Sequence, residues 1–400
     1  MRLLTVVLAA ALALPALAEK PRIKTFDEAW RTTRDRFYDK TMNGRDWAAL
    51  KEEYRPLAKK AKTQEELIGI TNRMLGELGV SHLVLIPKEA YQDHFVPEMG
   101  GKPTPQVGFE AVEVDGKLFV RNLLEGGPAD KAGIRRGDRL VRIAGVEAKA
   151  SERLTAAGSD PGLPWPPLWY VAADGKEPVE LVIESKKGRS RTVTIRPEPI
   201  SMVQASENSV RVIRHGGMKF GYVHTWHFLT PLIYGTVSKA MTEKFEDCDG
   251  LLLDIRGRGG SPLVMNAILG LFRTGAWDRP VVLLVDDRSR SAKEIFTWVF
   301  MDEDLGPTVG RTTEGAVLGS TFVELSDGSC LLVPVQNAQF YTKGEKLEGV
   351  GVTPHHVVDF PLPYANGYDE ILEFGKERLE IEVKRRRARA AIAMLLRLVS

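Results

Sequence analysis

Cysteine is nearly absent from this chain of 400 residues, which contains only Cys248 and Cys330. At most one disulfide can therefore form, and the sequence leaves open whether the two pair or are buried as separate thiols. The chain also lacks an excess of charge of either sign, because 55 Lys and Arg face 53 Asp and Glu, a net charge of +2. Without such an excess, and without a stripe of basic and aromatic residues, we expect no nucleic-acid partner.

The apolar run at the N-terminus is too short for a membrane span. It extends from Leu3 to Leu14, whereas a spanning helix needs roughly 20 residues. The run follows the positively charged Arg2 and precedes small residues up to Ala18, which is the pattern of a secretory signal peptide. We therefore predict that residues 1–18 are removed and that the mature protein is exported, to the periplasm or outside the cell.

The length and the apolar content suffice for two or three domains with cores of their own. The fold class that we expect is α/β, with an N-terminal helical segment, a β-rich domain, an α/β core with a partly parallel sheet, and a C-terminal helix. The predicted ranges are 1–18 for the signal peptide, 19–100 for the helical segment, 101–200 for the β-rich domain, 201–365 for the core and 366–400 for the C-terminal helix.

The helical segment carries the first pair of candidate functional residues. Capping boxes that begin at Thr25 and Thr63 predict two helix starts. After the second box, apolar residues recur at the spacing of a helix with one buried face. Ser81 and His82 follow, on the turn between this helix and the apolar stretch 83–86. A turn of this kind is well placed to present a side chain to a cleft.

Residues 101–200 have the character of short strands joined by Gly-rich turns. Residues 126–140 read Gly-Gly-Pro-Ala-Asp-Lys-Ala-Gly-Ile-Arg-Arg-Gly-Asp-Arg-Leu and resemble the signature of PDZ domains. The resemblance implies that Val107, Gly108 and Phe109 form a loop whose backbone N–H groups receive the C-terminal carboxylate of a peptide, while the peptide adds a strand to the sheet edge. An ordinary small β-domain is the alternative.

The core alternates strand and helix patterns. Apolar strand candidates at 250–256 and 281–285 are each followed by a turn and a helix-like stretch, which favours parallel pairing. The C-terminal segment from Tyr368 to Leu398 is predicted to be helical, with a basic cluster at 384–387. A solvated helix face is favoured over membrane contact for that cluster.

Ser291 is the candidate nucleophile because it stands where the buried strand 281–285 gives way to a helix. Backbone N–H groups at a helix start are unpaired, so the N–H of Ala292 can stabilise an oxyanion. The Gly-rich turn with Gly259 and Gly260, after the neighbouring strand, can supply a second donor because glycine lets backbone approach a ligand closely. Taken alone, however, a serine that opens a helix is more often an N-cap than a nucleophile.

The mature chain resembles the C-terminal processing (tail-specific) proteases in the order and spacing of its motifs. The motifs are the PDZ signature, Gly221-Tyr222-Val223, Leu252-Leu253-Asp254-Ile255-Arg256-Gly257, Ser291-Ala292-Lys293-Glu294 and Glu348-Gly349-Val350-Gly351-Val352-Thr353-Pro354. Two departures are His355 after Pro354, where the family usually has Asp, and Arg290 before the candidate nucleophile, where it usually has a smaller residue.

The family has a serine–lysine branch and a branch that resembles the tricorn protease core. In the first, a lysine follows in a segment Gly-x-x-Thr-x-Gly-Lys, but this chain has Ala316 at that lysine position. Lys293 is a poor substitute because residues two apart on a helix do not face each other. The resemblance to the second branch implies Ser291 as nucleophile and His82 as general base and then acid. Ser81 and Glu348, the latter 57 positions after Ser291, would orient the imidazole.

The sequence thus predicts an exported serine endopeptidase that recognises the C-termini of peptides or proteins through its PDZ domain. No cofactor is implied, and no metal site is expected, since His224 and His227 would lie on opposite faces of a strand. Peptides or proteins are the expected partners, and a homo-oligomer is left open. The alternative is a protein on the same fold that binds peptides or apolar ligands without hydrolysing them.

Overall fold

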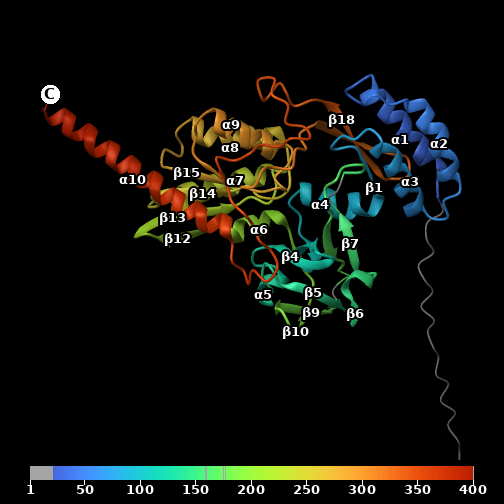
Figure 1. Ribbon diagram of the computed structural model, residues 1–400, viewed down its shortest axis with the longest axis horizontal. Helices are drawn as coiled ribbons and strands as arrows, with labels where there is room; N and C mark the ends of the chain where they lie inside the picture. The colour runs from blue at the N-terminus through green and yellow to red at the C-terminus, as the bar shows by residue number, and fades with distance from the viewer. Residues whose placement is uncertain (1–20, 158–159, 174, 176, 400) are drawn as a thin grey trace, which may run out of the picture.

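The computed structural model describes residues 21–157, 160–173, 175 and 177–399. The predicted signal peptide at 1–18 lies outside these residues. Three bodies follow one another: a helical N-terminal segment, a β-rich domain and an α/β core, from which a long C-terminal helix projects (Figure 1). The predicted fold class is confirmed by this arrangement.

The N-terminal segment packs three helices around one apolar core, α1 (Ile23–Arg36), α2 (Trp47–Lys59) and α3 (Gln64–Gly76). Thr63 caps α3 as predicted, since its side chain accepts a hydrogen bond from the N–H of Glu66. The predicted cap at Thr25 was wrong, because α1 already begins at Ile23 and the hydroxyl of Thr25 donates to Asp327 instead, at 2.7 Å.

A small antiparallel sheet joins this segment to the core. Strand β1 (Val84–Ile86) pairs with β18 (Cys330–Gln336), which pairs with β17 (Gly319–Glu324). The turn that carries Ser81 and His82 lies between α3 and β1, as the sequence predicts. It is therefore tied at one end to a packed helix and at the other to a strand of the core.

The β-rich domain is built on an eight-stranded antiparallel sheet in the order β10-β9-β5-β4-β3-β8-β7, with β6 paired to β5. Its entry and exit segments, β2 and β11, pair with each other, so the domain is inserted between the helical segment and the core. The elements are β2 (Thr104–Gln106), β3 (Phe109–Val114), β4 (Lys117–Leu123), α5 (Pro128–Lys131), β5 (Arg139–Ile143), β6 (Val146–Glu147), β7 (Leu154–Ala157), β8 (Leu168–Val171), β9 (Val179–Lys186), β10 (Arg189–Ile195) and β11 (Glu198–Ile200).

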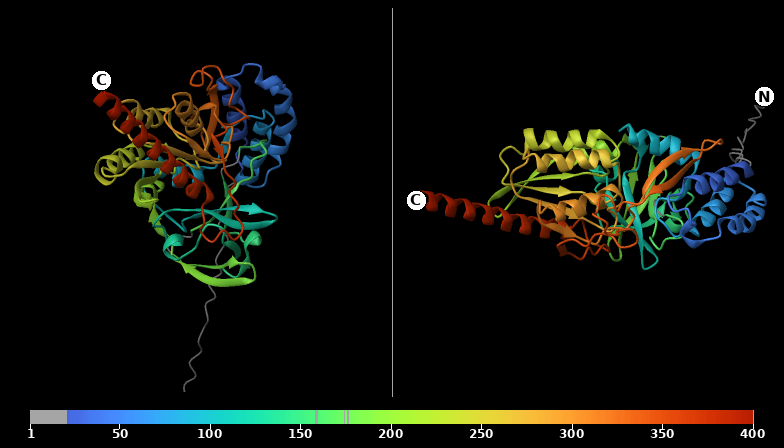
Figure 2. Two further views of the ribbon diagram at one scale, coloured as in Figure 1. Left: turned by 60° about the vertical axis from the view of Figure 1, so that its left-hand side comes forward. Right: turned by 90° about the horizontal axis from the view of Figure 1, so that it is seen from above.

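The core sheet has six strands in the order β12-β13-β14-β15-β16-β19, and all neighbours from β13 onward are parallel. Helices α7, α8 and α9 cover one face and α10 covers the other (Figure 2). The elements are α6 (Met202–Ser209), β12 (Arg211–His215), β13 (Met218–His224), α7 (Pro231–Lys239), β14 (Gly250–Asp254), α8 (Pro262–Arg273), β15 (Val281–Val285), α9 (Ala292–Asp302), β16 (Thr308–Gly310), β19 (His356–Val357) and α10 (Glu370–Val399). A short α4 (Val96–Met99) precedes the inserted domain.

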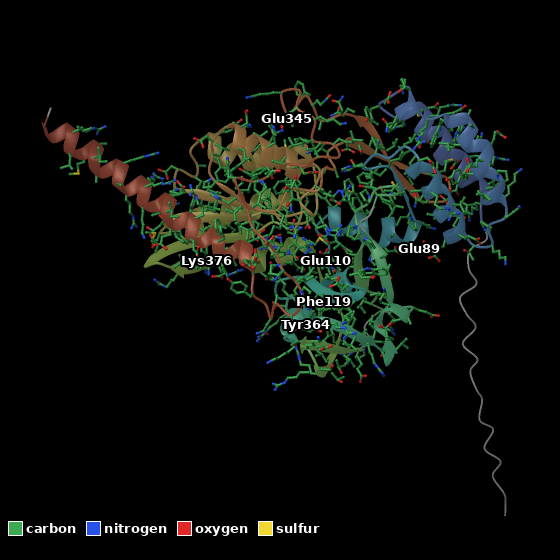
Figure 3. The ribbon with its side chains drawn as sticks, in the orientation of Figure 1. Glu89, Glu110, Phe119, Glu345, Tyr364 and Lys376 are labelled. Carbon is green, nitrogen blue, oxygen red and sulfur yellow. The ribbon has the colours of Figure 1, made fainter. Side chains whose placement is uncertain are left out.

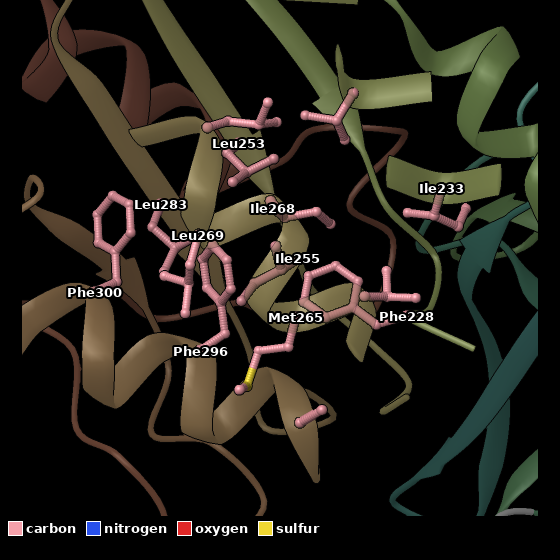
Figure 4. Close-up of a cluster of buried hydrophobic side chains, with 14 of the residues drawn as sticks. Phe228, Ile233, Leu253, Ile255, Met265, Ile268, Leu269, Leu283, Phe296 and Phe300 are labelled. Carbon is pink, nitrogen blue, oxygen red and sulfur yellow. The ribbon is translucent and has the colours of Figure 1, made fainter. Parts of the chain in front are cut away.

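Apolar side chains from β14, β15, α8 and α9 interlock under the first face (Figure 4). Because β14 and β15 are buried on both faces, their side chains are apolar without alternation, as parallel strands require. Both cysteines are free and buried, Cys248 in this cluster and Cys330 on β18. Within the described residues, no helix is long and apolar enough to cross a membrane.

Candidate active site

Ser291 occupies a strained turn between β15 and α9. Its backbone has φ 56° and ψ −128°, a region that residues with a side chain rarely adopt. The N–H of Ser291 donates to the carbonyl oxygen of Ala316 at 2.7 Å, which helps to hold the turn. A strained strand–turn–helix with a serine at its apex is the geometry that exposes the nucleophile of many hydrolases.

His82 also has a positive φ, 60°, and it ends a chain of hydrogen bonds. Its Nδ1 lies 2.8 Å from the Oγ of Ser81, and that Oγ lies 3.0 Å from Oε2 of Glu348. The backbone N–H of Ser81 donates to Oε1 of the same carboxylate at 2.8 Å. An ionised carboxylate can only accept hydrogen bonds, so the Ser81 hydroxyl donates its hydrogen bond to Glu348. The Oγ of Ser81 then accepts a hydrogen bond from Nδ1–H of His82. The tautomer of His82 that results leaves Nε2 with a free lone pair.

The backbone of Ala316 and Val317 connects the hydrogen-bonded residues His82, Ser81 and Glu348 to Ser291. The carbonyl oxygen of Ala316 accepts the N–H of Ser291, and the N–H of Val317 donates to Oε2 of Glu348 at 2.9 Å. The structure therefore joins Ser81, His82 and Glu348 directly by hydrogen bonds, and it connects them to Ser291 through the backbone of Ala316 and Val317.

The environment keeps His82 neutral. Only 8% of the residue is exposed, and burial lowers its pKa well below 6.5, with the guanidinium of Arg290 adding to the shift. Burial also raises the pKa of Glu348, while the hydrogen bonds that it accepts oppose that change. A neutral imidazole is the form that can accept a proton.

The turn from Gly257 to Gly260 lies directly beside Ser291. A side chain at Gly259 would stand 2.7 Å from the Cβ of Ser291, and one at Gly260 would collide with the backbone of Phe228. Both positions therefore require glycine. Ala292 is the first residue of α9, so its N–H has no acceptor within the helix. Of the three predicted oxyanion donors, Gly259 lies against Ser291, Ala292 follows it in the chain, and Gly260 packs on Phe228.

Two residues that bear on the serine–lysine alternative lie away from any proton-transfer position. Ala316 is fully buried and contributes only its backbone. Lys293 is fully buried as well, and its Nζ donates to the carbonyl oxygens of Thr225 and Arg256 at 2.5 Å and 3.4 Å. Burial lowers the pKa of Lys293 to about 7, against the opposing charges of Asp286 and Asp254.

Glu294 is a buried carboxylate whose role the sequence did not indicate. It accepts hydrogen bonds from the Thr313 hydroxyl at 2.6 Å and from the N–H groups of Gly315 and Ala316 at 2.6 Å and 2.7 Å. Burial raises its pKa to about 7, although these hydrogen bonds favour the charged form. Glu294 thus fastens the segment 313–316 to the helix that begins at the nucleophile.

Arg290 meets a carboxylate from the β-rich domain. Its Nη2 lies 2.5 Å from Oδ2 of Asp160, in the loop between β7 and β8, and its Nε lies 3.5 Å from Glu314. In the same loop, the carbonyl oxygen of Pro166 accepts a hydrogen bond from Nη2 of Arg288 at 2.6 Å. The loop also lines, through Leu163 and Trp165, a pocket of about 300 Å³ beside Glu348. These contacts could not be predicted from the sequence, because the loop lacks a motif.

The three residues of the candidate carboxylate-binding loop stand at the start of β3. Val107 and Phe109 are buried, and Gly108 has φ +92°. The carbonyl of Val107 accepts the N–H of Ala129 at 3.0 Å, which fixes the loop against α5. The outer edge of β3 is not free, since β8 pairs with it at Ala111 and Trp169.

The histidines of the core bind different carboxylates. His224 lies 2.9 Å from Glu125 through Nδ1, and His227 lies 2.9 Å from Glu98 through Nε2. The two rings therefore do not share a ligand site.

Three family profiles match parts of the chain. That of the tricorn protease C1 domain matches residues 19–76, that of the PDZ domain matches 119–154, and that of peptidase family S41 matches 267–358. The last range includes Ser291 and Glu348. Ser81, His82 and the turn with Gly259 lie outside all three.

Curated relatives extend the similarity over most of the chain. A putative tricorn protease homolog 2 of Streptomyces coelicolor is 29% identical over 89% of this chain, but the match spans only 32% of that protein. A carboxyl-terminal-processing protease of Synechocystis sp. is 26% identical over 87% of this chain and 83% of its own length. The chain thus spans about a third of the tricorn relative and most of the processing protease.

Solved structures share the fold. The photosystem II D1 C-terminal processing protease aligns over 86% of this chain and 96% of its own, with 22% identity and a TM-score of 0.51. The tricorn protease aligns over 90% of this chain and 37% of its own, with 19% identity and a TM-score of 0.52. The family profiles and the curated relatives together confirm the resemblance inferred from the sequence motifs.

Proposed function

We propose, from the premise that this chain is a serine-type peptidase of family S41, that it hydrolyses peptide bonds with Ser291 as nucleophile and His82 as general base. The observation that carries the proposal is the hydrogen-bonded chain Glu348–Ser81–His82. It fixes the imidazole in the tautomer that a base needs, at a site where a strained serine opens a helix.

The proton movements follow from this geometry. Nε2 of His82 takes the hydroxyl proton of Ser291 as the Ser291 Oγ attacks the scissile carbonyl. The imidazolium that forms keeps its hydrogen bond from Nδ1–H to the Oγ of Ser81. Glu348 stabilises the positive charge through the Ser81 hydroxyl. The oxyanion is held by the N–H of Ala292 and by the turn with Gly259 and Gly260. His82 then gives this proton to the leaving amine as the C–N bond breaks, which leaves the acyl group on Ser291. A water molecule, deprotonated by His82, next attacks the ester, releases the acid product and restores the Ser291 hydroxyl.

The test is labelling of the purified protein with a fluorophosphonate probe, followed by mapping of the modified residue. We expect modification at Ser291 only. The Ser291→Ala variant should fold normally and lose roughly four powers of ten in kcat. Ser201→Ala is the matched control, because Ser201 is an ordinary N-cap that accepts the N–H of Gln204 at 3.1 Å. It should lose about 1 kcal/mol of stability and keep both labelling and hydrolysis. A labelled residue other than Ser291 would refute the assignment.

We further propose that the loop of Val107, Gly108 and Phe109 receives the C-terminal carboxylate of a peptide or protein substrate. The match to PDZ domains supports this role. Because β8 already pairs with β3, a substrate tail either displaces β8 or pairs only with the first residues of β3 beside the loop.

Tail recognition is tested with one internally cleaved peptide whose terminus is free or amidated. The free acid should be cleaved with the lower KM. Gly108→Ala should remove that difference, because a Cβ would lie 3.1 Å from Pro128 in a backbone with φ +92°. Gly116→Ala, at φ +74° with open space around it, is the control. Equal KM values for both peptides in the wild type would sink tail recognition and leave the catalytic assignment standing.

Export is a further proposal, supported by the signal-peptide pattern at 1–18. Expression of the full chain in a bacterium, followed by fractionation and mass measurement, should give a periplasmic or secreted product that begins after Ala18. An intact N-terminus on protein in the cytosol would contradict it.

A further inference from the structure

The turn from Gly257 to Gly260 carries two of the proposed oxyanion donors, Gly259 and Gly260. The core holds this second half of the turn, since the N–H of Phe228 donates to the carbonyl oxygen of Gly259 at 2.9 Å and Phe228 forms a β-bridge with Gly260. The glycines of the turn contribute no side chains, and Gly257 has φ +87°. Glycine backbone is the most mobile, so a donor on such a turn needs support from outside. Both polar supports near its first half lead to the β-rich domain.

The first support runs through Arg258, the one long side chain in the turn. Its Nη2 donates to Oε1 of Glu110 at 2.7 Å and to the hydroxyl of Tyr170. Tyr170 in turn donates to Glu110 at 3.0 Å. Glu110 lies on β3, directly after the candidate carboxylate-binding loop, and Tyr170 lies on the adjoining β8. In Figure 3, Glu110 is seen at the boundary between the β-rich domain and the core.

The carboxylate of this contact is buried, whereas the Arg258 side chain is 34% exposed. Glu110 is only 4% exposed, and burial would disfavour its charge. The charge of Arg258 and the hydrogen bonds nevertheless hold the pKa of Glu110 below its usual value. The Arg258 side chain is therefore fixed at its end by two strands of another domain.

The second support reaches the first residue of the turn. The N–H of Gly257 donates to Oδ1 of Asp286 at 2.9 Å, and Arg121 of β4 binds Oδ2 of Asp286 at 2.8 Å. Asp286 also accepts the N–H of Arg288 at 3.1 Å, in the loop that leads to the nucleophile. The β-rich domain thus fixes the oxyanion turn at two successive residues.

We propose that the β-rich domain sets the geometry of the oxyanion hole, and that Glu110 and Arg258 are positioning residues for hydrolysis. The inference rests on the proposed function and extends it: the inserted domain contributes to the chemical step as well as to substrate binding. A displacement of about 1 Å at a catalytic group can cost 10²-fold in rate, so loss of this support acts on kcat. Substrate binding remote from the turn is unaffected, so KM changes little.

The experiment compares Arg258→Met, Arg258→Lys and Glu110→Gln with the wild type by kcat, KM and the rate of fluorophosphonate labelling at Ser291. Arg258→Met should lower kcat and the labelling rate by roughly 10- to 100-fold. Arg258→Lys keeps the charge and should recover part of that loss. Removal of Arg258 leaves Glu110 buried and unpaired, so Arg258→Met/Glu110→Gln is included to keep a foldable protein. The double variant should be no slower than Arg258→Met, because the two residues act through one contact.

Arg136→Met is the matched control. Arg136 also ties the β-rich domain to the core, through the carbonyl oxygens of Pro361 and Tyr368 at 2.9 Å and 2.7 Å, away from the turn. It should lower the melting temperature and leave kcat per labelled site unchanged. An unchanged kcat in Arg258→Met, or an equal loss in Arg136→Met, would overturn the positioning role. Absence of labelling at Ser291 in the wild type would instead refute the proposed function.

Discussion

Lys293 stands two residues after the proposed nucleophile, but its side chain points into the core. Its Nζ is committed to two carbonyl oxygens, and its pKa near 7 reflects the cost of burying a charge. His82 and Lys293 therefore offer a sharp comparison of the two catalytic branches.

We expect His82→Ala to lose activity and labelling by several powers of ten, since it removes the proposed general base. Lys293→Met should retain both, because it keeps the volume of the fully buried chain and removes a costly charge. Alanine would be a poor choice at this position, since it would leave a cavity. Measurement of kcat and of the labelling rate decides whether histidine or lysine is the base. If Lys293→Met were folded but inactive and His82→Ala were active, the chain would belong to the serine–lysine branch.

The pH dependence of kcat/KM is set by the same residues. A base must be unprotonated, so activity falls as the pH drops through its pKa. Burial and Arg290 lower the pKa of His82 below 6.5, and burial raises that of Glu348 above 4.5. The acid limb of the profile should therefore lie at lower pH than the usual pKa of a histidine, and it belongs to the coupled pair of His82 and Glu348.

Substitutions at Asp160 and at Arg290 should shift the acid limb of the kcat/KM profile in opposite directions. Asp160→Asn leaves the charge of Arg290 less neutralised, so the pKa of His82 falls and the limb moves to lower pH. Arg290→Gln removes the cation, so the pKa of His82 rises and the limb moves to higher pH. Profiles of kcat/KM from pH 4 to 8 measure both. Shifts of the same sign would show that Arg290 does not act on His82 through its charge.

Several residues of the candidate site could be predicted because motif and spacing carry their chemistry. Ser81, His82, Ser291 and Glu348 stand in recognisable stretches, and hydrogen bonds join Ser81, His82 and Glu348 in the structure. The partners Asp160 and Glu110 could not be predicted, since each acts across more than a hundred residues of sequence and neither lies in a motif. Contacts of that range depend on how whole elements pack.

At the scale of elements, the loop between β7 and β8 passes very close to the end of α3. A Cβ at Gly162 would lie 2.1 Å from the carbonyl oxygen of Gly76, and Gly162 has φ +77°. The close approach seats the loop that carries Asp160 and Trp165 beside the site.

We expect Gly162→Ala to destabilise the protein by about 3 kcal/mol, from the strained φ and from the backbone collision together. Gly188→Ala isolates the first contribution, because Gly188 has φ +79° and open space around it. It should cost only about 1 kcal/mol. Chemical unfolding of both variants provides the comparison. Equal losses would mean that the loop shifts away from α3 without resistance.

The parallel strands of the core were predictable because burial on both faces leaves an uninterrupted apolar run, as in Val281–Val285. The hairpin of β7 and β8 was not, since its loop is rich in proline and glycine and its strands are short. The cap at Thr25 failed for a local reason: the hydroxyl found a distant partner, Asp327, and the helix began earlier.

At the scale of the whole molecule, the β-rich domain and the core share buried ion pairs. Arg121 binds Asp286 and Arg258 binds Glu110, with little exposure at either acid. Each pair loses its compensation if one domain is removed.

Deletion of residues 107–195, with the paired strands β2 and β11 kept and joined, should therefore destabilise the core by several kcal/mol. The core would retain Asp286 and Arg258 without their charged partners Arg121 and Glu110. Adding Asp286→Asn and Arg258→Met to the deletion should recover part of the loss in melting temperature. A deleted protein as stable as the full chain would show that these pairs contribute nothing across the boundary.

The proposed catalytic residues lie far apart in the chain, and proteins are synthesised from the N-terminus. Ser81 and His82 leave the ribosome first, Ser291 follows some two hundred residues later, and Glu348 comes after it. Until Glu348 has emerged and docked, His82 has no fixed tautomer and Ser291 has no competent base. A growing chain, whose unfolded segments are easily cleaved, is thus inert toward itself and its neighbours. Because the residues emerge in this order, the proposed active site assembles only when most of the chain has folded and resists proteolysis.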